Sequence, residues 1–230
     1  MPIEKHINFF EMEKAIDEAP FECPVCHIVN KRAWRYLDNM LFEHVSDRGF
    51  RAKHREAGGF CAEHAKSLST FRDGLAVAIM GQDILEDRIK ALSSGKKWQP
   101  KGWCPVCEER DKIEHEYLGF LVKNNEESPE EKEFCELFYK SRGLCIPHYT
   151  VMAEGVKNHK FGNIRKVPQW LSNFHLNRYK RLLERTRIMI DLSAYGRQEE
   201  FRQLSPEDQI VWKELAACLS GNAVRSRGGF

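Results

Sequence analysis

Long apolar runs are missing from the 230-residue chain, whose mean hydropathy is −0.56. A membrane-spanning helix needs roughly 18 consecutive apolar residues, so we expect no membrane span. Residues 1–20 carry acidic side chains throughout and lack the apolar core of an export signal. We therefore expect a cytoplasmic protein, in a compartment where thiols stay reduced.

Signatures of catalysis and of β-structure are also missing. The sequence contains no Gly-rich phosphate loop, no GxSxG motif and no HExxH helix. No segment alternates apolar and polar residues with the period of two that a half-buried strand shows. These absences predict an all-α fold and leave us without a candidate catalytic residue.

Cysteine, by contrast, is abundant, with eight residues. In a chain without an export signal, this number indicates metal binding or redox chemistry before disulfides. Six of the cysteines and two histidines form two copies of the pattern CPVC followed by CxxH. The first copy contains Cys23, Cys26, Cys61 and His64, and the second contains Cys104, Cys107, Cys145 and His148. Cys135 and Cys218 have no counterpart, and we predict that they are core thiols.

Further matches extend the internal repeat beyond the cysteines. A Tyr-Leu pair follows the first cysteine of each copy by 13 residues, and a glycine stands two residues before each third cysteine. We predict a first metal-binding helical repeat at 1–95 and a second at 103–160. The Ser- and Gly-containing segment 93–102 reads as a linker between them. Residues 161–230 are expected to form helices that pack on the repeats, with a frayed tail at 222–230.

Three thiolates and one imidazole form a Cys₃His set, which fills the tetrahedral shell of Zn²⁺ and leaves no position for water. Such sites are structural, and the repeat predicts two Zn²⁺ ions per chain. The third cysteine and the histidine are three residues apart, a spacing that places both on one face of a first helical turn. The four ligands of one repeat form the simplest site. Pairing across the repeats, Cys23 and Cys26 with Cys145 and His148, remains open.

Other cofactors use similar motifs. An iron–sulfur cluster is held by the same residue types, so an electron carrier is the main alternative. The segment from Cys23 to His27 also matches the CxxCH of haem attachment, but Glu108 replaces the histidine in the second copy. A thioredoxin-like redox pair requires a preceding strand, which the sequence does not predict.

Apolar periodicity predicts the helices that surround these motifs. We expect helices at 26–45 and 47–57, and one long helix from the third ligand to Leu92. Its buried side is predicted from residues at helical spacing: Ala65, Leu68, Leu75, Ile79, Leu85, Ile89 and Leu92. In the second half, Ser-Pro-Glu-Glu at 128–131 starts a helix, a long helix covers 168–194, and a last helix runs from Ser205 to near Gly221.

Charge is unevenly distributed along the chain. Residues 101–156 have a net charge of −5 and residues 157–230 have +7. Arg178, Arg181 and Arg185 share one side of the predicted long helix, a pattern that fits nucleic acid or an acidic partner. The stronger interpretation is that these arginines flank the packed edge and pair with the acidic middle segment.

With these motifs in place, the chain resembles an uncharacterised bacterial family of tandem CxxC/CxxH proteins. The resemblance rests on GFCAEH at 59–64 and GLCIPH at 143–148, and on segments 47–50, 74–79 and 212–221. It implies a cytoplasmic bacterial protein of unknown function with the same eight Cys and His ligands. We therefore predict a zinc-binding interaction or adaptor module with a protein partner.

Overall fold

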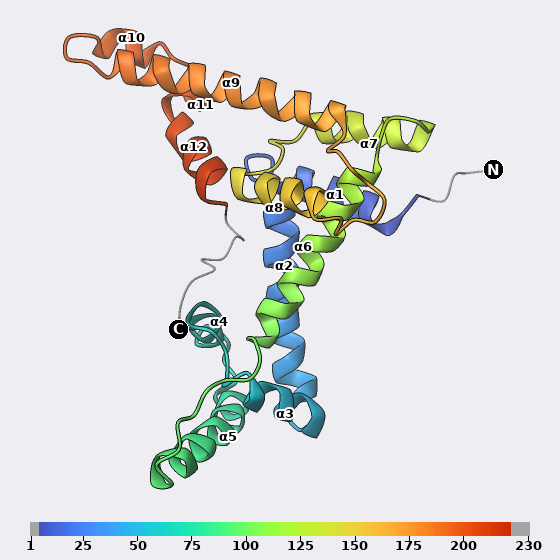
Figure 1. Cartoon of the computed structure of the whole chain (residues 1–230). Coiled ribbons are helices and arrows are strands. Elements are labelled where there is room, and N and C mark those ends of the chain that lie inside the picture. Colours follow the sequence, from blue (N-terminus) through green and yellow to red (C-terminus); the bar gives the residue numbers. More distant parts are fainter. Residues whose placement is uncertain (1–4, 222–230) are drawn as a thin grey trace. The chain divides into compact units, whose positions relative to one another are not determined.

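The computed structural model describes residues 5–221, which form helices and connecting turns without a β-strand (Figure 1). The prediction of an all-α fold is confirmed. The chain divides into two compact units: unit 1 combines Met1–Val29 with His115–Phe230, and unit 2 is Asn30–Glu114. These units differ from the segments 1–95, 103–160 and 161–230 expected from the repeat, because each repeat contributes to both units. The tail expected at 222–230 lies outside the described residues.

Unit 1 is built around aromatic side chains. It comprises α1 (Ile7–Glu18), the start of α2 (Pro24–Asn39), the end of α6 (Pro105–Lys123), α7 (Pro129–Tyr139), α8 (Ile146–Lys157), α9 (Gln169–Leu192), α10 (Gln198–Arg202), α11 (Pro206–Gln209) and α12 (Val211–Ser220). Phe134 of α7 contacts Phe120 of α6 and Phe9 of α1, with ring centroids 4.8 and 5.8 Å apart. Trp170 of α9 packs on Phe138 and donates a 2.6 Å hydrogen bond to the Asn124 carbonyl. These contacts join α1, α6, α7 and α9 in one core.

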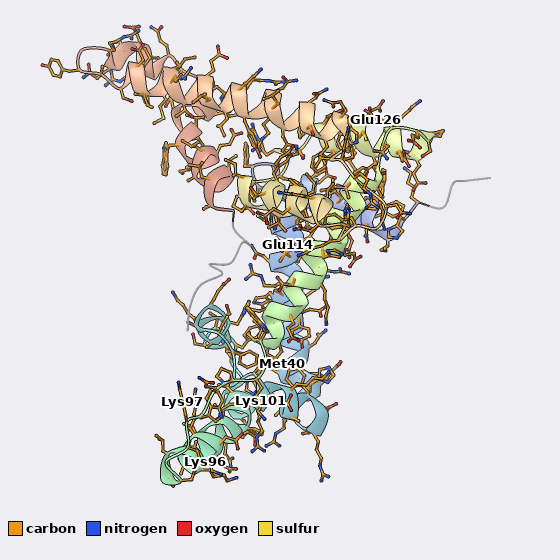
Figure 2. All side chains as sticks on the ribbon, in the orientation of Figure 1. Met40, Lys96, Lys97, Lys101, Glu114 and Glu126 are labelled. Carbon is orange, nitrogen blue, oxygen red and sulfur yellow. The ribbon has the colours of Figure 1, made fainter. Side chains whose placement is uncertain are left out.

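Unit 2 has an aliphatic core. It contains the rest of α2, the π-helical turn η1 (Met40–His44), α3 (Arg48–Glu56), α4 (Ala62–Leu68), α5 (Gly74–Ser93) and the start of α6. Met40, labelled in Figure 2, is fully buried. It belongs to one buried cluster with Leu37, Leu68 and Met80. The linker after α5 is non-helical as predicted, and the Lys101 amide donates to the Glu56 carbonyl at 2.8 Å.

Several predicted helix starts are confirmed by their caps. The Ser128 hydroxyl accepts a hydrogen bond from the Glu131 amide at 3.1 Å, and α7 begins at Pro129. The Asp47 carboxylate accepts from the Phe50 amide at the start of α3. Such caps satisfy amides that have no partner inside the helix, which is why short polar motifs predict helix starts well.

The long helix predicted from the third ligand to Leu92 is wrong, because the chain forms two helices there, α4 and α5. The hydroxyls of Ser69 and Thr70 donate to carbonyls of the preceding turn, at 2.7 Å each. Asp73 then caps the new helix by accepting from the Ala76 amide. Local side-chain hydrogen bonds thus compete with helix continuation, as they commonly do for Ser, Thr and Asp. The last predicted helix is likewise divided into α11 and α12.

The predicted buried side is confirmed at Leu68 of α4, which is buried, and at Ile79, which is partly buried against the core of unit 2, but it is wrong at Ala65 and at the other predicted positions in α5. Leu75, Leu85, Ile89 and Leu92 are exposed, and the buried residues are Ala76, Met80 and Asp83. Asp83 accepts two 2.7 Å hydrogen bonds from Arg51 of α3. The face of α5 turned toward α3 is therefore partly ionic, so apolar periodicity does not identify it.

Candidate metal centres

Site 1 consists of Cys23, Cys26, Cys145 and His148, all buried within unit 1. Their ligand atoms lie within 4.8 Å of one another. The Cys26 and Cys145 Sγ atoms are 3.7 Å apart. The Nδ1 atom of His148 lies 3.2 to 3.4 Å from the three sulfurs.

Site 2 consists of Cys61, His64, Cys104 and Cys107, all within unit 2. The Cys61 and Cys107 Sγ atoms are 3.6 Å apart. The Nδ1 atom of His64 lies 3.2 to 3.5 Å from the three sulfurs. The two sites therefore have the same composition and nearly the same internal spacing.

The ligand motifs are paired across the sequence repeat. Each CPVC meets the CxxH of the other half, which is the arrangement that the sequence left open. All eight predicted metal ligands are thus brought together in two groups, and metal binding by them stays a prediction. No sequence signal distinguishes this pairing from pairing within a half, because both use the same residue types and spacings.

Helix starts position the ligands. Cys61 and Cys145 are the N-cap residues of α4 and α8. Cys23 and Cys104 stand directly before α2 and α6, whose first turns contain Cys26 and Cys107. Each site therefore joins two helix N-termini, where the partial positive charge of the backbone favours thiolates.

Because the sulfurs are packed closely, they shift one another's pKa values. A hydrogen bond from Cys107 is the main cause that lowers the pKa of Cys104 to about 3, against the opposing effect of burial. Burial also opposes ionisation of Cys23, yet hydrogen bonds from Cys145 and Cys26 hold its pKa well below the usual value. The pKa of Cys145 is raised by its hydrogen bonds with Cys23 and Cys26. Within site 1, one thiolate therefore disfavours the next, and a bound cation would relieve this repulsion.

The donor set fits a metal ion. Each group offers three sulfurs and one imidazole nitrogen, the soft and borderline ligands that zinc and iron take in proteins. The histidine nitrogen that faces the sulfurs is Nδ1 in both sites. The matched set of donors, repeated in two places, suits a tetrahedral ion at each.

The loop that carries Cys145 is held by α9. The Leu144 amide donates to Nε2 of His175 at 2.8 Å, and the Leu144 carbonyl accepts from Arg178 at 3.2 Å. His175 itself donates from Nδ1 to the Leu171 carbonyl at 2.7 Å. Gly143 has a φ of +65°, and a Cβ there would lie 2.8 Å from Phe174, so only glycine fits. The backbone segment that presents Cys145 to site 1 is therefore held in place by α9.

Site 2 has an ion pair beside its histidine. Arg110 is 3% exposed and donates to the Glu63 carboxylate at 2.7 Å. The same guanidinium nitrogen lies 3.5 Å from Nε2 of His64. Neither Arg110 nor His175 belongs to a motif with a chemical signature, so the sequence does not predict a role for them at the sites.

Cys135 and Cys218 belong to neither of the two ligand groups. They are 1% and 3% exposed, respectively, so they are buried as predicted. Burial raises the pKa of Cys135 to about 12 and also raises that of Cys218. Both thiols are therefore protonated and unreactive at neutral pH.

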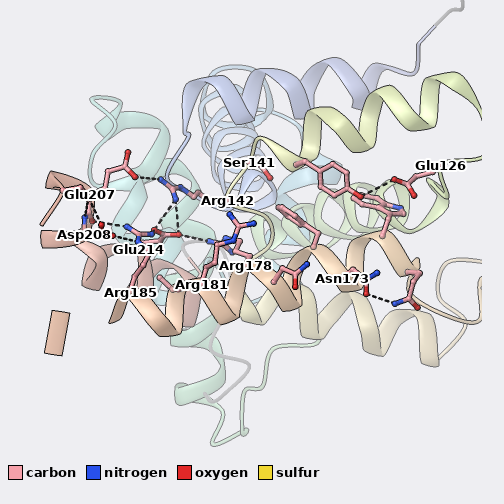
Figure 3. A pocket seen from close by; sticks show the side chains of 17 residues that line it. Glu126, Ser141, Arg142, Asn173, Arg178, Arg181, Arg185, Glu207, Asp208 and Glu214 are labelled. Atoms are coloured by element: carbon pink, nitrogen blue, oxygen red, sulfur yellow. Dashed lines mark hydrogen bonds and ion pairs between the residues drawn. The ribbon is translucent and has the colours of Figure 1, made fainter. Parts of the chain in front are cut away.

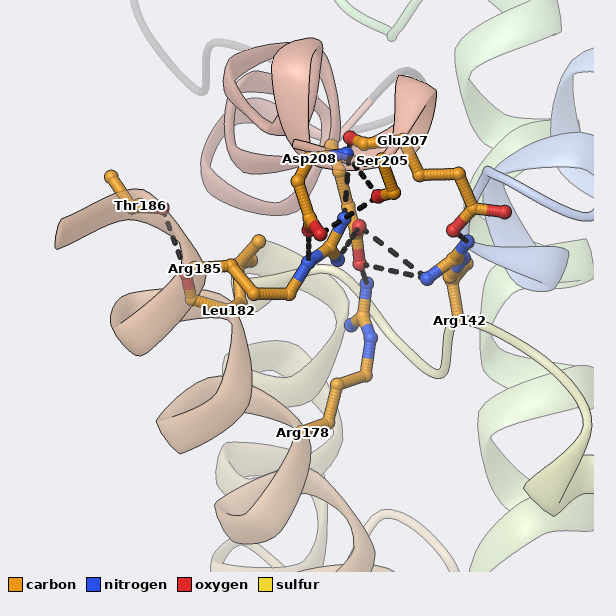
Figure 4. A network of polar contacts seen from close by, with 9 residues as sticks. Arg142, Arg178, Leu182, Arg185, Thr186, Ser205, Glu207 and Asp208 are labelled. Atoms are coloured by element: carbon orange, nitrogen blue, oxygen red, sulfur yellow. Dashed lines mark hydrogen bonds and ion pairs between the residues drawn. The ribbon is translucent and has the colours of Figure 1, made fainter. Parts of the chain in front are cut away.

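The arginines predicted to meet a partner line an open cavity of about 890 Å³ between α9 and the C-terminal helices (Figure 3). Glu214 of α12 lies 2.7 Å from Arg185 and 3.7 Å from Arg178. Asp208 adds a 2.5 Å contact to Arg185 (Figure 4). The expected pairing with the acidic middle segment is wrong for these two residues, because their partners lie in 206–214. Arg181 is exposed at the rim, and nucleic-acid binding stays a prediction.

The fold and the two sites define an all-α protein with two Cys₃His groups suited to metal binding. Residues 3–103 match the sequence profile of the Family of unknown function (DUF6062). Over 137 residues the chain is 36% identical to the "Uncharacterized 23.9 kDa protein in xynA 3'region" of Caldicellulosiruptor sp. (strain Rt8B.4). This match covers 57% of the chain and 66% of that protein, just under two thirds of its length. No solved structure matches the chain.

These comparisons confirm the resemblance to an uncharacterised bacterial family. The tandem CxxC/CxxH pattern of that family stays a prediction. Within residues 5–221, no helix is both long and apolar enough to cross a bilayer.

Proposed function

We propose that the protein binds two Zn²⁺ ions, one in site 1 and one in site 2, and that both ions are structural. The observation that carries the proposal is the convergence of four Cys and His donors in each site, which makes each coordination set a closed set of four. A closed set leaves no position for a substrate or an attacking water, which is the property of structural zinc sites.

The spacing of the ligands supports a single ion over a cluster. Tetrahedral coordination with Zn–S bonds of about 2.3 Å separates two sulfurs by about 3.8 Å. The Sγ–Sγ separations of 3.7 Å in site 1 and 3.6 Å in site 2 are close to this value. Several irons and bridging sulfides would have to lie between the ligands, which needs a wider set.

Structural ions would supply folding free energy. Zinc-finger peptides gain on the order of 10 kcal/mol from one ion at neutral pH. Here the ion in site 1 would connect the starts of α2 and α8, and the ion in site 2 would connect the starts of α4 and α6.

Elemental analysis of the full chain, purified without added metal, tests the proposal. We expect two zinc ions per chain and a colourless protein. A brown chromophore with iron and acid-labile sulfide would support the electron-carrier alternative instead and contradict the proposal. A chain that folds fully without any metal would contradict it as well.

Matched ligand variants make the test specific. Cys61→Ser and Cys145→Ser should each remove one zinc ion and lower the melting temperature. Cys135→Ser alters a cysteine outside both sites and should keep two ions. If Cys61→Ser retains two ions and full thermal stability, the structural role of site 2 is wrong.

We further propose that the protein acts through its surface, as an interaction or adaptor module. The support is the exposed apolar side of α5, where Leu75, Leu85, Ile89 and Leu92 are 61% to 81% exposed. Exposed apolar residues at such density are typical of surfaces used for association. Because these side chains lie outside both sites, the double substitution Leu85→Glu and Ile89→Glu should leave the metal content unchanged.

A further inference from the structure

The two metal sites differ in how well their ligands are covered. In site 1 the third cysteine, Cys145, is 1% exposed, whereas its counterpart in site 2, Cys61, is partly exposed. The remaining cysteine ligands are all buried. Among the six cysteine ligands, Cys61 is therefore the residue most open to an oxidant or alkylating reagent in solvent.

The backbone before the third cysteine shows the same difference. In site 1, His175 and Arg178 bind the amide and the carbonyl of Leu144. The corresponding residue of site 2 is Phe60. Among the residues that the structure describes, no hydrogen bond is found to the Phe60 amide or carbonyl. The Phe60 backbone therefore lacks the two side-chain hydrogen bonds that hold the Leu144 backbone in site 1.

The immediate neighbours of the ligands differ too. Arg110 and Glu63 form an ion pair at site 2, and the Glu63 side chain is 58% exposed. The corresponding positions at site 1 are Val29, which is 1% exposed, and Pro147. Site 2 thus has a polar, partly solvated border where site 1 has an apolar one.

We propose that Cys61 is a site of oxidative modification and that site 2 is the metal site that opens under peroxide. This inference rests on the proposed metal binding. The modification would leave site 1 intact, so that one of the two ions is exchangeable and the other is permanent.

The chemistry requires a peroxide as oxidant. The Cys61 thiolate attacks one peroxide oxygen, the O–O bond breaks, and hydroxide leaves, which gives a sulfenic acid on Cys61. The Cys107 thiolate, whose sulfur lies 3.6 Å away, then attacks this sulfur and displaces a second hydroxide. Two thiolates are oxidised by two electrons, and hydrogen peroxide is reduced to two hydroxide ions. The ion loses two of its four ligands and is released.

The test uses the full chain loaded with zinc, whose content is measured before any oxidant is added. Hydrogen peroxide is then added with 4-(2-pyridylazo)resorcinol, which reports released zinc by its absorbance. We expect one ion to be released at least about tenfold faster than the other, as accessible thiolates react before covered ones. Peptide mapping should find a Cys61–Cys107 disulfide at that stage, with Cys145 still reduced.

Two matched variants show which site releases the faster of the two ions. Cys61→His keeps four donors in site 2 but removes the reactive sulfur, so it should abolish the fast release. Cys145→His makes the same change in site 1 and should leave the fast release intact. If a variant fails to fold, peptide mapping of the wild-type chain still identifies the first oxidised thiol.

Fewer than two ions before oxidation would contradict the proposed function itself. Two ions that leave at equal rates, no release under peroxide, or first oxidation at any cysteine other than Cys61 would overturn only the present inference.

Discussion

His175 holds the loop that carries a predicted metal ligand, although it lies 30 residues beyond Cys145 in the sequence. Its ring must be neutral, because Nε2 accepts from the Leu144 amide while Nδ1 donates to the Leu171 carbonyl. Burial lowers the pKa of His175 to about 4, which agrees with this assignment. The sequence predicted ligands but not this residue, since a lone histidine on a helix carries no signal of its partners.

We expect His175 to make stability depend on pH. In the unfolded chain it binds a proton near pH 6.5, whereas in the folded chain it does so only near pH 4. Its contribution is therefore complete above pH 6.5 and is lost as the pH falls toward 4, with a maximum of about 3 kcal/mol. Urea unfolding of the wild type and of His175→Gln between pH 7 and 4 measures this contribution as the difference between the two curves.

Protonation of the metal ligands affects both proteins in that experiment and cancels in the difference. The two pH profiles should converge as the pH is lowered. Parallel profiles would show that His175 does not titrate on unfolding.

At the scale of elements, α5 shows what periodicity predicts and what it does not. Apolar spacing predicts one long helix in this stretch, whereas the chain forms α4 and α5, and the buried face of α5 is the one opposite to that predicted. Met80 is 2% exposed in the core of unit 2, and Asp83 and Asp87 bind arginines of α3. Apolar spacing identifies the buried face of a helix only where its apolar residues face the core. It misidentifies the buried face of α5 because ion pairs join this helix to α3 and leucines remain at the surface.

Substitutions on the two faces of α5 should therefore differ in cost. Met80→Ala removes a buried side chain and is expected to lower the free energy of unfolding by about 2–4 kcal/mol. Leu85→Ala, at a position that is 64% exposed, should change it by less than about 0.5 kcal/mol. Urea denaturation of both variants with bound zinc makes the comparison. A larger loss of unfolding free energy for Leu85→Ala than for Met80→Ala would show that the face predicted from apolar periodicity is the buried one.

The last helix depends on one carboxylate. Glu214 of α12 is contacted by Arg142, Arg178 and Arg185, and its side chain is 11% exposed. Glu214→Gln should lower the free energy of local opening of α12 by about 2 kcal/mol, because three guanidinium groups would lose the carboxylate that they share. Hydrogen exchange of the α12 amides would report the change.

Glu207→Gln is the matched control for that prediction. Glu207 contacts Arg142 at 3.4 Å, but its side chain is 61% exposed, so its removal should have little effect. Equal exchange rates in the two variants would contradict the central role of Glu214.

At the scale of the whole molecule, the ligands could be predicted and their partners could not. The repeat identified all eight residues that the structure gathers into two groups, because the ligand chemistry is local in the sequence. Which CPVC meets which CxxH depends on how the helices pack. The sulfur atoms of Cys26 and Cys145 meet across a separation of 119 residues, a distance at which no local pattern is informative.

The crossed pairing can be tested by cutting the chain. A protease site inserted between the exposed residues Lys96 and Lys97 would separate the two sequence halves. Because each Cys₃His group contains residues from both halves, the zinc-loaded cleaved fragments should elute together with two zinc ions and separate after chelation under reducing conditions. Fragments that purify apart, each with its own ion, would show pairing within the halves instead.

The crossed pairing also orders events during synthesis. Site 2 needs residues 61–107, and site 1 needs residues 23–148, so one ligand set is nested inside the other. As the chain emerges from the ribosome, the inner set is complete about 40 residues before the outer one. Cys23 and Cys26 lack their final partners, Cys145 and His148, until His148 has been added. If both sites bind zinc as proposed, the inner set can therefore capture its ion before the outer set is complete.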